Sequence, residues 1–166
     1  QKTVEAARPQ RAEKHQMEKM GPSVDKLFRS PNDGRNLALD RRMMNPRLPT
    51  SETGKVSACA ENGYAIWQRT AANHSTQMVF GDLSTPKNNG QFNVYDALRD
   101  MLTDMGIPAN EIAYIHNAKT EAQKKELFGK VRSGQVRVLI GSTQKMGAGT
   151  NVQQRLIALH HLDCPW

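Results

Sequence analysis

The stretch Val136-Arg137-Val138-Leu139-Ile140 decides the fold class. It is a short, mostly aliphatic run, which is typical of a strand covered on both faces. It leads directly into residues 141–153, Gly-Ser-Thr-Gln-Lys-Met-Gly-Ala-Gly-Thr-Asn-Val-Gln, which are rich in small and hydroxyl side chains. A buried strand that runs into such a loop indicates a parallel α/β sheet, in which ligands collect at the carboxyl ends of the strands.

The same alternation of strand and helix continues outward on both sides of this stretch. We expect further strands near residues 77–81, 112–116 and 156–162. Three helices are predicted between or before them: one over 54–72, one carrying a one-sided apolar stripe between Asn93 and Gly106, and one that starts at Thr120 with Gln123 as its capping box and ends near 133–134. The fold class is therefore α/β, a parallel sheet with helices on both faces.

The first 50 residues differ in composition from the rest. Residues 1–48 hold 11 Lys/Arg and 6 Asp/Glu, and so carry most of the net charge of +7. They lack a sustained apolar face, residues 32–34 (Asn-Asp-Gly) form a turn signal, and Pro46 and Pro49 break any long element. We predict a basic linker or docking segment over 1–50, irregular or helical, that packs less well than one folded domain over 51–166.

Composition excludes several classes of protein. The chain has 166 residues and two cysteines, Cys59 and Cys164, without metal-like spacing and too few for a disulfide framework. No run approaches the roughly 20 apolar residues of a membrane span, and no signal peptide is visible. We expect a cytoplasmic, monomeric protein with no metal site and no membrane partner. The first residue, Gln1, and the closing Cys-Pro-Trp indicate a piece cut from a longer protein.

Residues 141–153 carry the strongest chemical signal. Small residues allow a phosphate or another lobe to approach the backbone, hydroxyl and N–H groups can donate to phosphate oxygens, and Lys145 adds charge. The simpler interpretation is an ordinary tight turn between a strand and a helix. The Gly147-x-Gly149 pair lacks the Gly-Lys-Ser/Thr ending of a Walker A loop and the third glycine of a dinucleotide fingerprint.

Residues 138–151, Val-Leu-Ile-Gly-Ser-Thr-x-x-x-Gly-x-Gly-x-Asn, resemble motif V of the Swi/Snf-type ATPases in helicase superfamily 2. Residues 156–166 resemble the strand that follows this motif, with its Asp-x-x-Trp end, and residues 76–82 resemble motif IV. The resemblance covers about residues 54–166, although the family usually has glycine where this chain has Asn117. Residues 32–40 and 79–86 are also similar to the methylase–helicase proteins of phages and conjugative elements, which are linked to antirestriction.

The resemblance implies the second RecA-like lobe of an ATP-dependent DNA helicase or translocase, truncated before the arginine-bearing motif VI. DNA and the upstream ATP-binding lobe of the same polypeptide would be its partners. ATP and Mg²⁺ would bind the full two-lobe protein, an ATP hydrolase whose fusion to a methylase stays open. Neither would bind tightly to this chain, whose own enzymatic status also stays open. The alternative is a non-catalytic RecA-like DNA-binding or docking module of a DNA-modification protein. A Rossmann methyltransferase is disfavoured, because residues 80–86 form no glycine loop after the first strand.

The resemblance also implies roles for individual residues, none of them catalytic. The nucleotide side would comprise Gly147, Gly149 and Asn151. The nucleic-acid side would comprise Ser142, Thr143 and Lys145, extended on neighbouring loop ends by Ser84, Lys87, His116 and Lys119. For each residue the alternative is a solvated loop position. His160 and His161 are expected on opposite faces of a strand, and Asp163 as a strand-end orienter or a cap.

Overall fold

The computed structural model describes residues 31–87, 89–147 and 150–163. The chain divides into two compact units, residues 1–35 and residues 36–166. In the first unit the description is limited to the opening of helix α2 (Pro31–Leu39). The fold described below is that of the second unit.

Helices and strands alternate along the second unit. The α-helices are α3 (Lys55–Arg69), α4 (Val94–Met105), α5 (Glu121–Ser133) and α6 (Thr143–Met146). The strands are β1 (Thr76–Phe80), β2 (Ile112–Tyr114), β3 (Val138–Gly141) and β4 (Leu156–His161). Single 3-10 turns lie at Arg41–Met43, Ala71–Asn73, Ala109–Glu111, Ile115–Asn117 and Gln153–Arg155.

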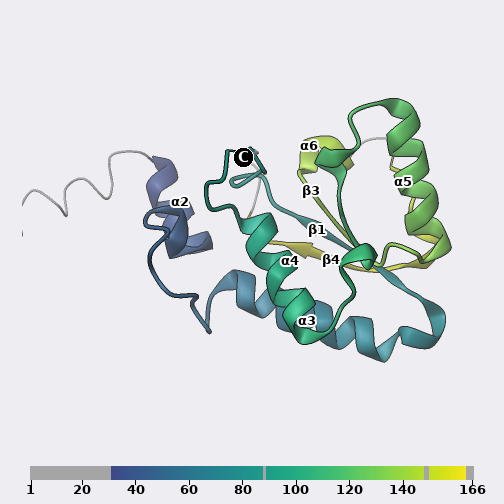
Figure 1. Ribbon diagram of the computed structural model, residues 1–166, viewed down its shortest axis with the longest axis horizontal. Coiled ribbons are helices and arrows are strands. Elements are labelled where there is room, and N and C mark those ends of the chain that lie inside the picture. The colour runs from purple at the N-terminus through teal and green to yellow at the C-terminus, as the bar shows by residue number, and fades with distance from the viewer. Residues whose placement is uncertain (1–30, 88, 148–149, 164–166) are drawn as a thin grey trace, which may run out of the picture. The chain divides into compact units, whose positions relative to one another are not determined.

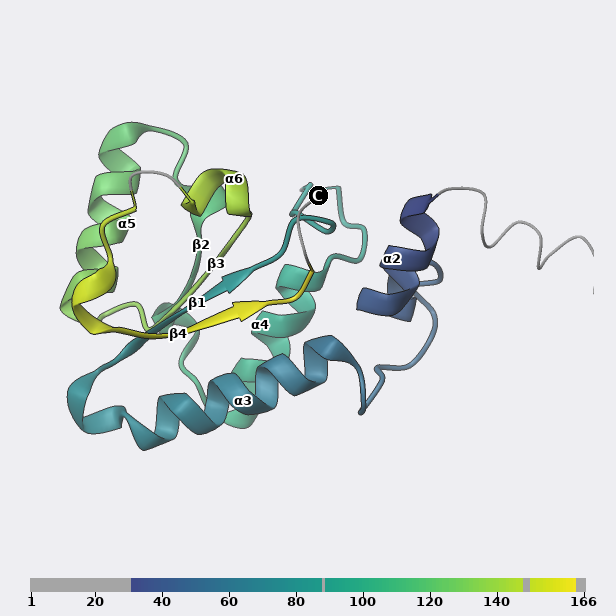
Figure 2. The same ribbon diagram turned by 180° about the vertical axis from the view of Figure 1, so that it is seen from behind.

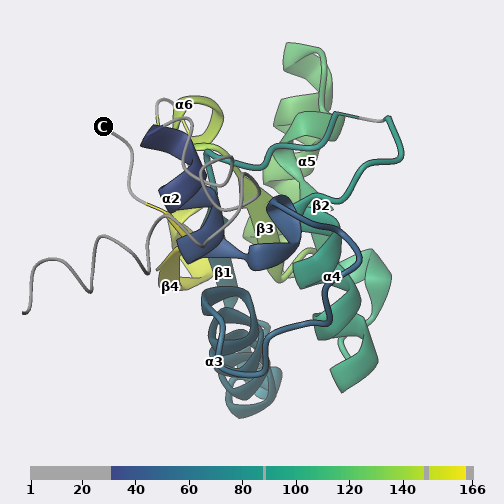
Figure 3. The same ribbon diagram turned by 90° about the vertical axis from the view of Figure 1, so that its left-hand side faces the viewer.

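The four strands form one sheet in the order β2-β3-β1-β4, and every pairing is parallel. Figure 3 shows β4, β1, β3 and β2 in this order from left to right. Helices cover both faces: α3 and α4 lie on one side of the sheet and α5 and α6 on the other (Figures 1 and 2). The predicted α/β fold with a parallel sheet is therefore confirmed.

Alternation along the strands builds two apolar cores, one for each face. Val79 of β1 and Ile140 of β3 pack with α3 and α4, and the core beneath them includes Leu98 and Leu102 of the apolar stripe on α4. Met78 and Phe80 of β1 point to the opposite face, where the core also contains residues of α5 and α6. A sheet buried on both faces explains why the strands read as continuous apolar runs in the sequence.

The helix ends follow local rules of capping. The Asn93 side chain accepts a hydrogen bond from the backbone of Asp96 at the start of α4, and Thr120 and Gln123 form the predicted capping box of α5. Gly106 and Gly134 end α4 and α5 at φ values of 120° and 82°, which side chains other than glycine rarely adopt. All four predicted positions are confirmed.

Three local predictions were wrong. Residues 32–34, read as a turn, lie inside α2, because proline at the first helical position and an acidic residue in the first turn favour a helix start. Residues 115–116 form a 3-10 turn rather than the end of β2, and residues 136–137 precede β3 instead of opening it. The second unit begins at residue 36, and Leu39 is buried in its core.

Strand β4 is an outer strand of the sheet and pairs with β1 alone among the described strands. Its side chains alternate between half-buried and exposed positions. His160 hydrogen-bonds Gln77 while His161 stacks on Phe80, so the two imidazoles occupy opposite faces as predicted. Over the described ranges, no helix combines the length and apolar character that crossing a membrane requires.

Candidate functional site at the carboxyl edge of the sheet

The carboxyl ends of all four strands meet at one edge of the sheet, as parallel pairing requires. Gly81 follows β1 and donates its N–H to Gly141 at the end of β3, 3.0 Å away. Leu162 follows β4 and donates to Phe80, also at 3.0 Å. In parallel α/β sheets this is the edge where ligands bind. Two carboxylates and one threonine organise it: Asp82, Asp163 and Thr143.

Asp82 ties the loop after β1 to the loop after β3. Its carboxylate accepts one hydrogen bond from the Thr143 backbone N–H at 2.8 Å and a second from the Thr143 hydroxyl at 2.7 Å. Thr143 is the first residue of α6, where backbone N–H groups have no partner inside the helix. Both hydrogen-bond donors of Thr143 are therefore used within the protein.

Asp163 ties β4 to the same loop from the other side. Its carboxylate accepts the backbone N–H of Asp82, at 2.9 Å and 3.1 Å from the two oxygens, and the N–H of Leu83 at 2.8 Å. Asp163 is buried, so these charge-assisted bonds form away from bulk water, where they are strong. Asp163 thereby fixes the loop that carries Asp82.

Two further side chains hold the loop after β1 against α4. The Tyr95 hydroxyl donates to the Gly81 carbonyl at 2.6 Å, and the Ser84 hydroxyl accepts the Val94 N–H at 2.9 Å. Burial of Tyr95 raises the pKa of its phenol, and the charges of Asp82 and Asp163 raise it further. Tyr95 therefore acts as a neutral hydrogen-bond donor at this edge.

Gly141 allows the loop after β3 to pack closely. A Cβ added at this position would clash with Ile115 and with the side chain of Met146. The glycine therefore lets α6 turn directly back over the end of β2. Ser142 is buried at the N-cap of α6, where its hydroxyl accepts the Lys145 N–H at 3.4 Å.

Three of the predicted nucleic-acid residues are exposed lysines on three successive strand ends. Lys87 lies in the loop after β1, Lys119 follows β2, and Lys145 is in α6 after β3. Because the sheet order is β2-β3-β1, these three loops are neighbours. The hydroxyl residues Ser84, Ser142 and Thr143 lie at the same edge, but each makes an internal hydrogen bond.

His116 lies between this edge and the core. Its ring packs edge-on against Tyr95 with centroids 5.4 Å apart, and its Nδ1 is buried without a hydrogen-bond partner. Burial lowers the pKa of His116, and the charge of Lys145 lowers it further. The imidazole is therefore neutral at pH 7, and it offers a hydrogen bond rather than a positive charge.

The predicted nucleotide side is only partly described. Gly147 ends α6 and is exposed, and an added Cβ there would lie 2.6 Å from the Thr143 carbonyl oxygen. Asn151 is exposed, and its carbonyl accepts a hydrogen bond of 2.8 Å from Arg132. Gly149 lies outside the described residues.

Asp82 and Asp163 are the residues of this edge whose positioning role the sequence pattern did not fix. Both carry the same signal: each stands two residues after the last residue of a strand, Phe80 or His161. In a parallel sheet, equivalent positions after neighbouring strands come together, and β1 pairs with β4. Once the order of the strands is known, this placement brings the two aspartates together.

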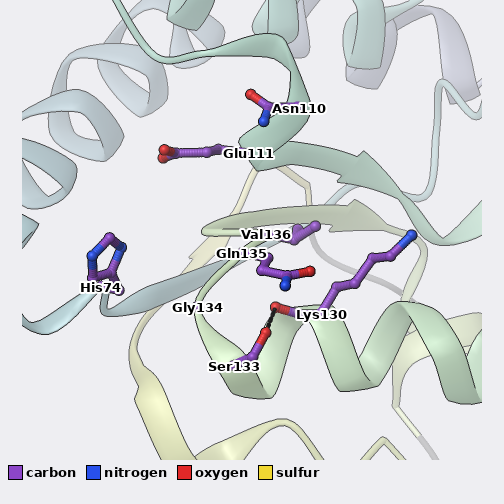
Figure 4. Close-up of a pocket in the computed structure, with 8 residues that line it drawn as sticks. All are labelled: His74, Asn110, Glu111, Lys130, Ser133, Gly134, Gln135 and Val136. Atoms are coloured by element: carbon purple, nitrogen blue, oxygen red, sulfur yellow. Dashed lines mark hydrogen bonds between the residues drawn. The ribbon is translucent and has the colours of Figure 1, made fainter.

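A cavity of about 520 Å³ lies elsewhere, near the amino ends of β2 and β3. Figure 4 shows Glu111 and Lys130 pointing away from one another across it. The Glu111 carboxylate accepts the Trp67 ring N–H at 2.6 Å, and Lys130 pairs with Glu126 at 2.8 Å. Its charged groups are directed to other partners, so they do not converge on a ligand.

Comparison with known proteins gave no match: no family model, no curated protein and no solved structure resembles the chain closely enough to report. Among the residues that the structure describes, no cluster of three or more His, Cys, Asp or Glu side chains is arranged to hold a metal ion.

Proposed function

We propose that the chain is the second RecA-like lobe of an ATP-dependent DNA motor of helicase superfamily 2. In this proposal the carboxyl edge of the sheet contributes part of the DNA track, and the loop around Gly147 and Asn151 forms one wall of the ATP cleft. The observation that carries the proposal is that Lys87, Lys119 and Lys145 are all exposed in the segments that follow three neighbouring strands. Cations gathered at one edge suit the negative charges of a phosphate backbone.

The internal hydrogen bonds distinguish residues that hold the loops in place from residues that are free to contact a ligand. Ser142 and Thr143 hold α6 in place through its N-cap and through Asp82. Lys145, two residues further along α6, is exposed and carries the charge. We assign phosphate contact to the lysines and positioning to the hydroxyl residues.

ATP hydrolysis would need the other lobe. Phosphoryl transfer requires a phosphate cradle, a bound Mg²⁺ and usually an arginine finger, which alone is worth about 10³–10⁵ in rate. The sequence contains no Gly-Lys-Ser/Thr phosphate loop. We expect this chain to show no ATP turnover by itself and to support DNA-stimulated turnover when joined to the nucleotide-binding lobe.

A second candidate is a DNA-binding or docking module without a motor role. This second candidate is favoured by the internal hydrogen bonds of Ser142 and Thr143. Because these hydroxyl groups are bonded within the protein, the exposed lysines are left to contact a ligand. The two candidates differ in ATP hydrolysis. A phosphate-release assay on the chain joined to its nucleotide-binding lobe separates them: DNA-stimulated release supports the motor, and folded, DNA-bound protein without release supports the module.

The DNA contact is tested by the salt dependence of binding. Labelled duplex DNA titrated by fluorescence anisotropy should give a log–log salt slope near −2.7 for three neutralised phosphates, at roughly 0.9 each. Lys145→Ala should reduce the slope by about 0.9. Lys125→Ala is the matched control, an exposed lysine on α5. Equal effects of the two variants, or no binding at about 50 mM salt, would contradict the proposal.

A further inference from the structure

A second cavity opens beside the proposed DNA track. It has a volume of about 310 Å³ and lies between the loop after β1, the first turns of α4 and the end of β2. Ligand pockets span about 300–1,000 Å³, so this one has room for a single base or nucleoside. Asp96, Arg99, Tyr114 and Asn117 contribute polar groups to its wall.

The Asp96 carboxylate is held in a fixed orientation at this wall. The Tyr114 hydroxyl donates to one carboxylate oxygen at 2.8 Å, and the Asn93 amide donates to the other. An ionised carboxylate has about four acceptor sites, so these two bonds leave acceptor capacity on both oxygens. The Asp96 side chain is 45% exposed and can therefore receive further donors from a ligand.

A cation completes the wall. The Arg99 guanidinium lies over the Tyr114 ring, 5.6 Å from its centroid, and 3.8 Å from Asp96. Its side chain is 42% exposed, so it keeps N–H groups available for an acceptor on a ligand. Asn117 is exposed at the end of the 3-10 turn after β2 and can serve as donor or acceptor.

This wall presents two carboxylate acceptors next to guanidinium and amide donors. Among the nucleic-acid bases, guanine matches best, because its N1–H and N2–H donors are adjacent and lie next to the O6 acceptor on one edge. Cytosine and adenine each offer one amino group to a carboxylate, and thymine offers one ring N–H. The matching edge of guanine is the Watson–Crick edge, which is open only in an unpaired base.

We propose that this cavity binds an unpaired guanine base of the nucleic-acid strand whose phosphates contact the neighbouring lysines. Asp96 accepts the N1–H and N2–H donors, and Arg99 or Asn117 donates to O6. The proposal rests on the proposed function for its polymer, since Lys87 and Lys119 lie two residues from the cavity residues Asn89 and Asn117. Recognition of the base itself depends only on the cavity.

The test compares a labelled oligothymidine strand with the same strand carrying one central guanine. We expect the guanine strand to bind the whole chain about tenfold more tightly, as a good bidentate contact allows. Asp96→Asn should abolish this preference and leave oligothymidine affinity unchanged. Asp104→Asn is the matched control, because it removes the same charge from an exposed site on α4 outside the cavity.

A second measurement keeps the test decisive if Asp96→Asn does not fold. Asn117→Ala changes an exposed side chain and should weaken only the guanine strand. In NMR titrations, free guanosine monophosphate should shift the amide signals of Tyr114 and Asn117, and cytidine monophosphate should not. Guanosine binding without DNA binding would contradict the proposed function but support the assignment of the cavity. DNA binding without guanine preference and without guanosine shifts would overturn the cavity assignment alone.

Discussion

The amino edge and the carboxyl edge of the sheet use charged side chains in different ways. At the amino edge, Arg137 is almost fully buried, and its guanidinium donates to the carbonyls of Ser75 and Trp67 at 3.0 Å and 2.8 Å and to the Thr70 hydroxyl at 2.9 Å. At the carboxyl edge, Asp82 and Asp163 accept bonds that hold loops bearing exposed lysines. The amino edge joins core elements to each other, whereas the carboxyl edge shapes a surface. We therefore expect mutations at the two edges to separate stability from binding.

The largest effect is expected at the amino edge. Arg137→Met removes the donor of two carbonyls and a hydroxyl, and the net contribution of one hydrogen bond to stability is about 1 kcal/mol. We expect a loss of about 3 kcal/mol and a fall in Tm of about 10 °C, measured by circular dichroism. DNA affinity measured well below Tm should not change. Arg69→Met, at an exposed site on α3, is the control, and an equal fall in Tm for both variants would refute the assigned role of Arg137.

A smaller loss of stability, coupled to binding, is expected at the carboxyl edge. Asp82→Ala and Thr143→Val each remove the hydroxyl–carboxylate bond, so each should cost about 1–2 kcal/mol in urea unfolding. The double variant should cost about 1 kcal/mol less than the sum of the two, because the residues act as a pair. Both single variants should weaken DNA binding, since they release α6 and Lys145.

Thr143→Ser provides the rescue at this position, because it keeps the hydroxyl that Asp82 accepts. It should behave like the unmodified chain in both unfolding and DNA binding. Additive losses in the double variant would show that Asp82 and Thr143 do not act as a pair. DNA affinity unaffected by Asp82→Ala would show that the carboxyl edge, like the amino edge, contributes to stability and not to binding.

The interactions that the sequence predicted join residues close together in the chain, and those that it missed join residues far apart. The caps at Asn93 and Thr120 were predictable because each helix start is stabilised by residues three positions apart. The Asp82–Thr143 and Asp163–Asp82 contacts join residues 61 and 81 positions apart, and no local pattern encodes them. The apolar runs predicted the strands, and the sheet order then determined which strand ends became neighbours.

The errors have a local cause as well. The Asn-Asp-Gly sequence at 32–34 is a turn signal when it stands alone, but here it follows Pro31, which is well suited to the first position of a helix. At the candidate site, the sequence suggested phosphate contact for the hydroxyl groups at 142 and 143, but not their partners within the protein. Ser142 Oγ accepts the Lys145 N–H, and Thr143 Oγ donates to Asp82.

The smallest expected effect is a change in the pH dependence of stability at His160, near the end of β4. Its ring Nε2 lies 2.8 Å from the Gln77 amide oxygen, and the Gln77 amide donates in turn to the Gly63 carbonyl of α3. Burial lowers the pKa of His160, and the neighbouring His161 lowers it further.

The folded state therefore binds a proton less readily than the unfolded chain, whose histidines titrate near 6.5. The contribution of His160 to the free energy of unfolding should be constant above this pH and should fall as the pH drops from about 6.5 through the folded-state pKa. His160→Gln keeps a hydrogen-bond donor without a titrating ring, so its unfolding free energy should fall less between pH 8 and pH 5 than that of the unmodified chain. Urea unfolding at the two pH values measures the difference, with the pH 8 values correcting for any change in packing. His116 also titrates below its ordinary pKa, so a residual slope is expected in the variant. Parallel curves for the two proteins would show that burial of His160 does not couple folding to pH.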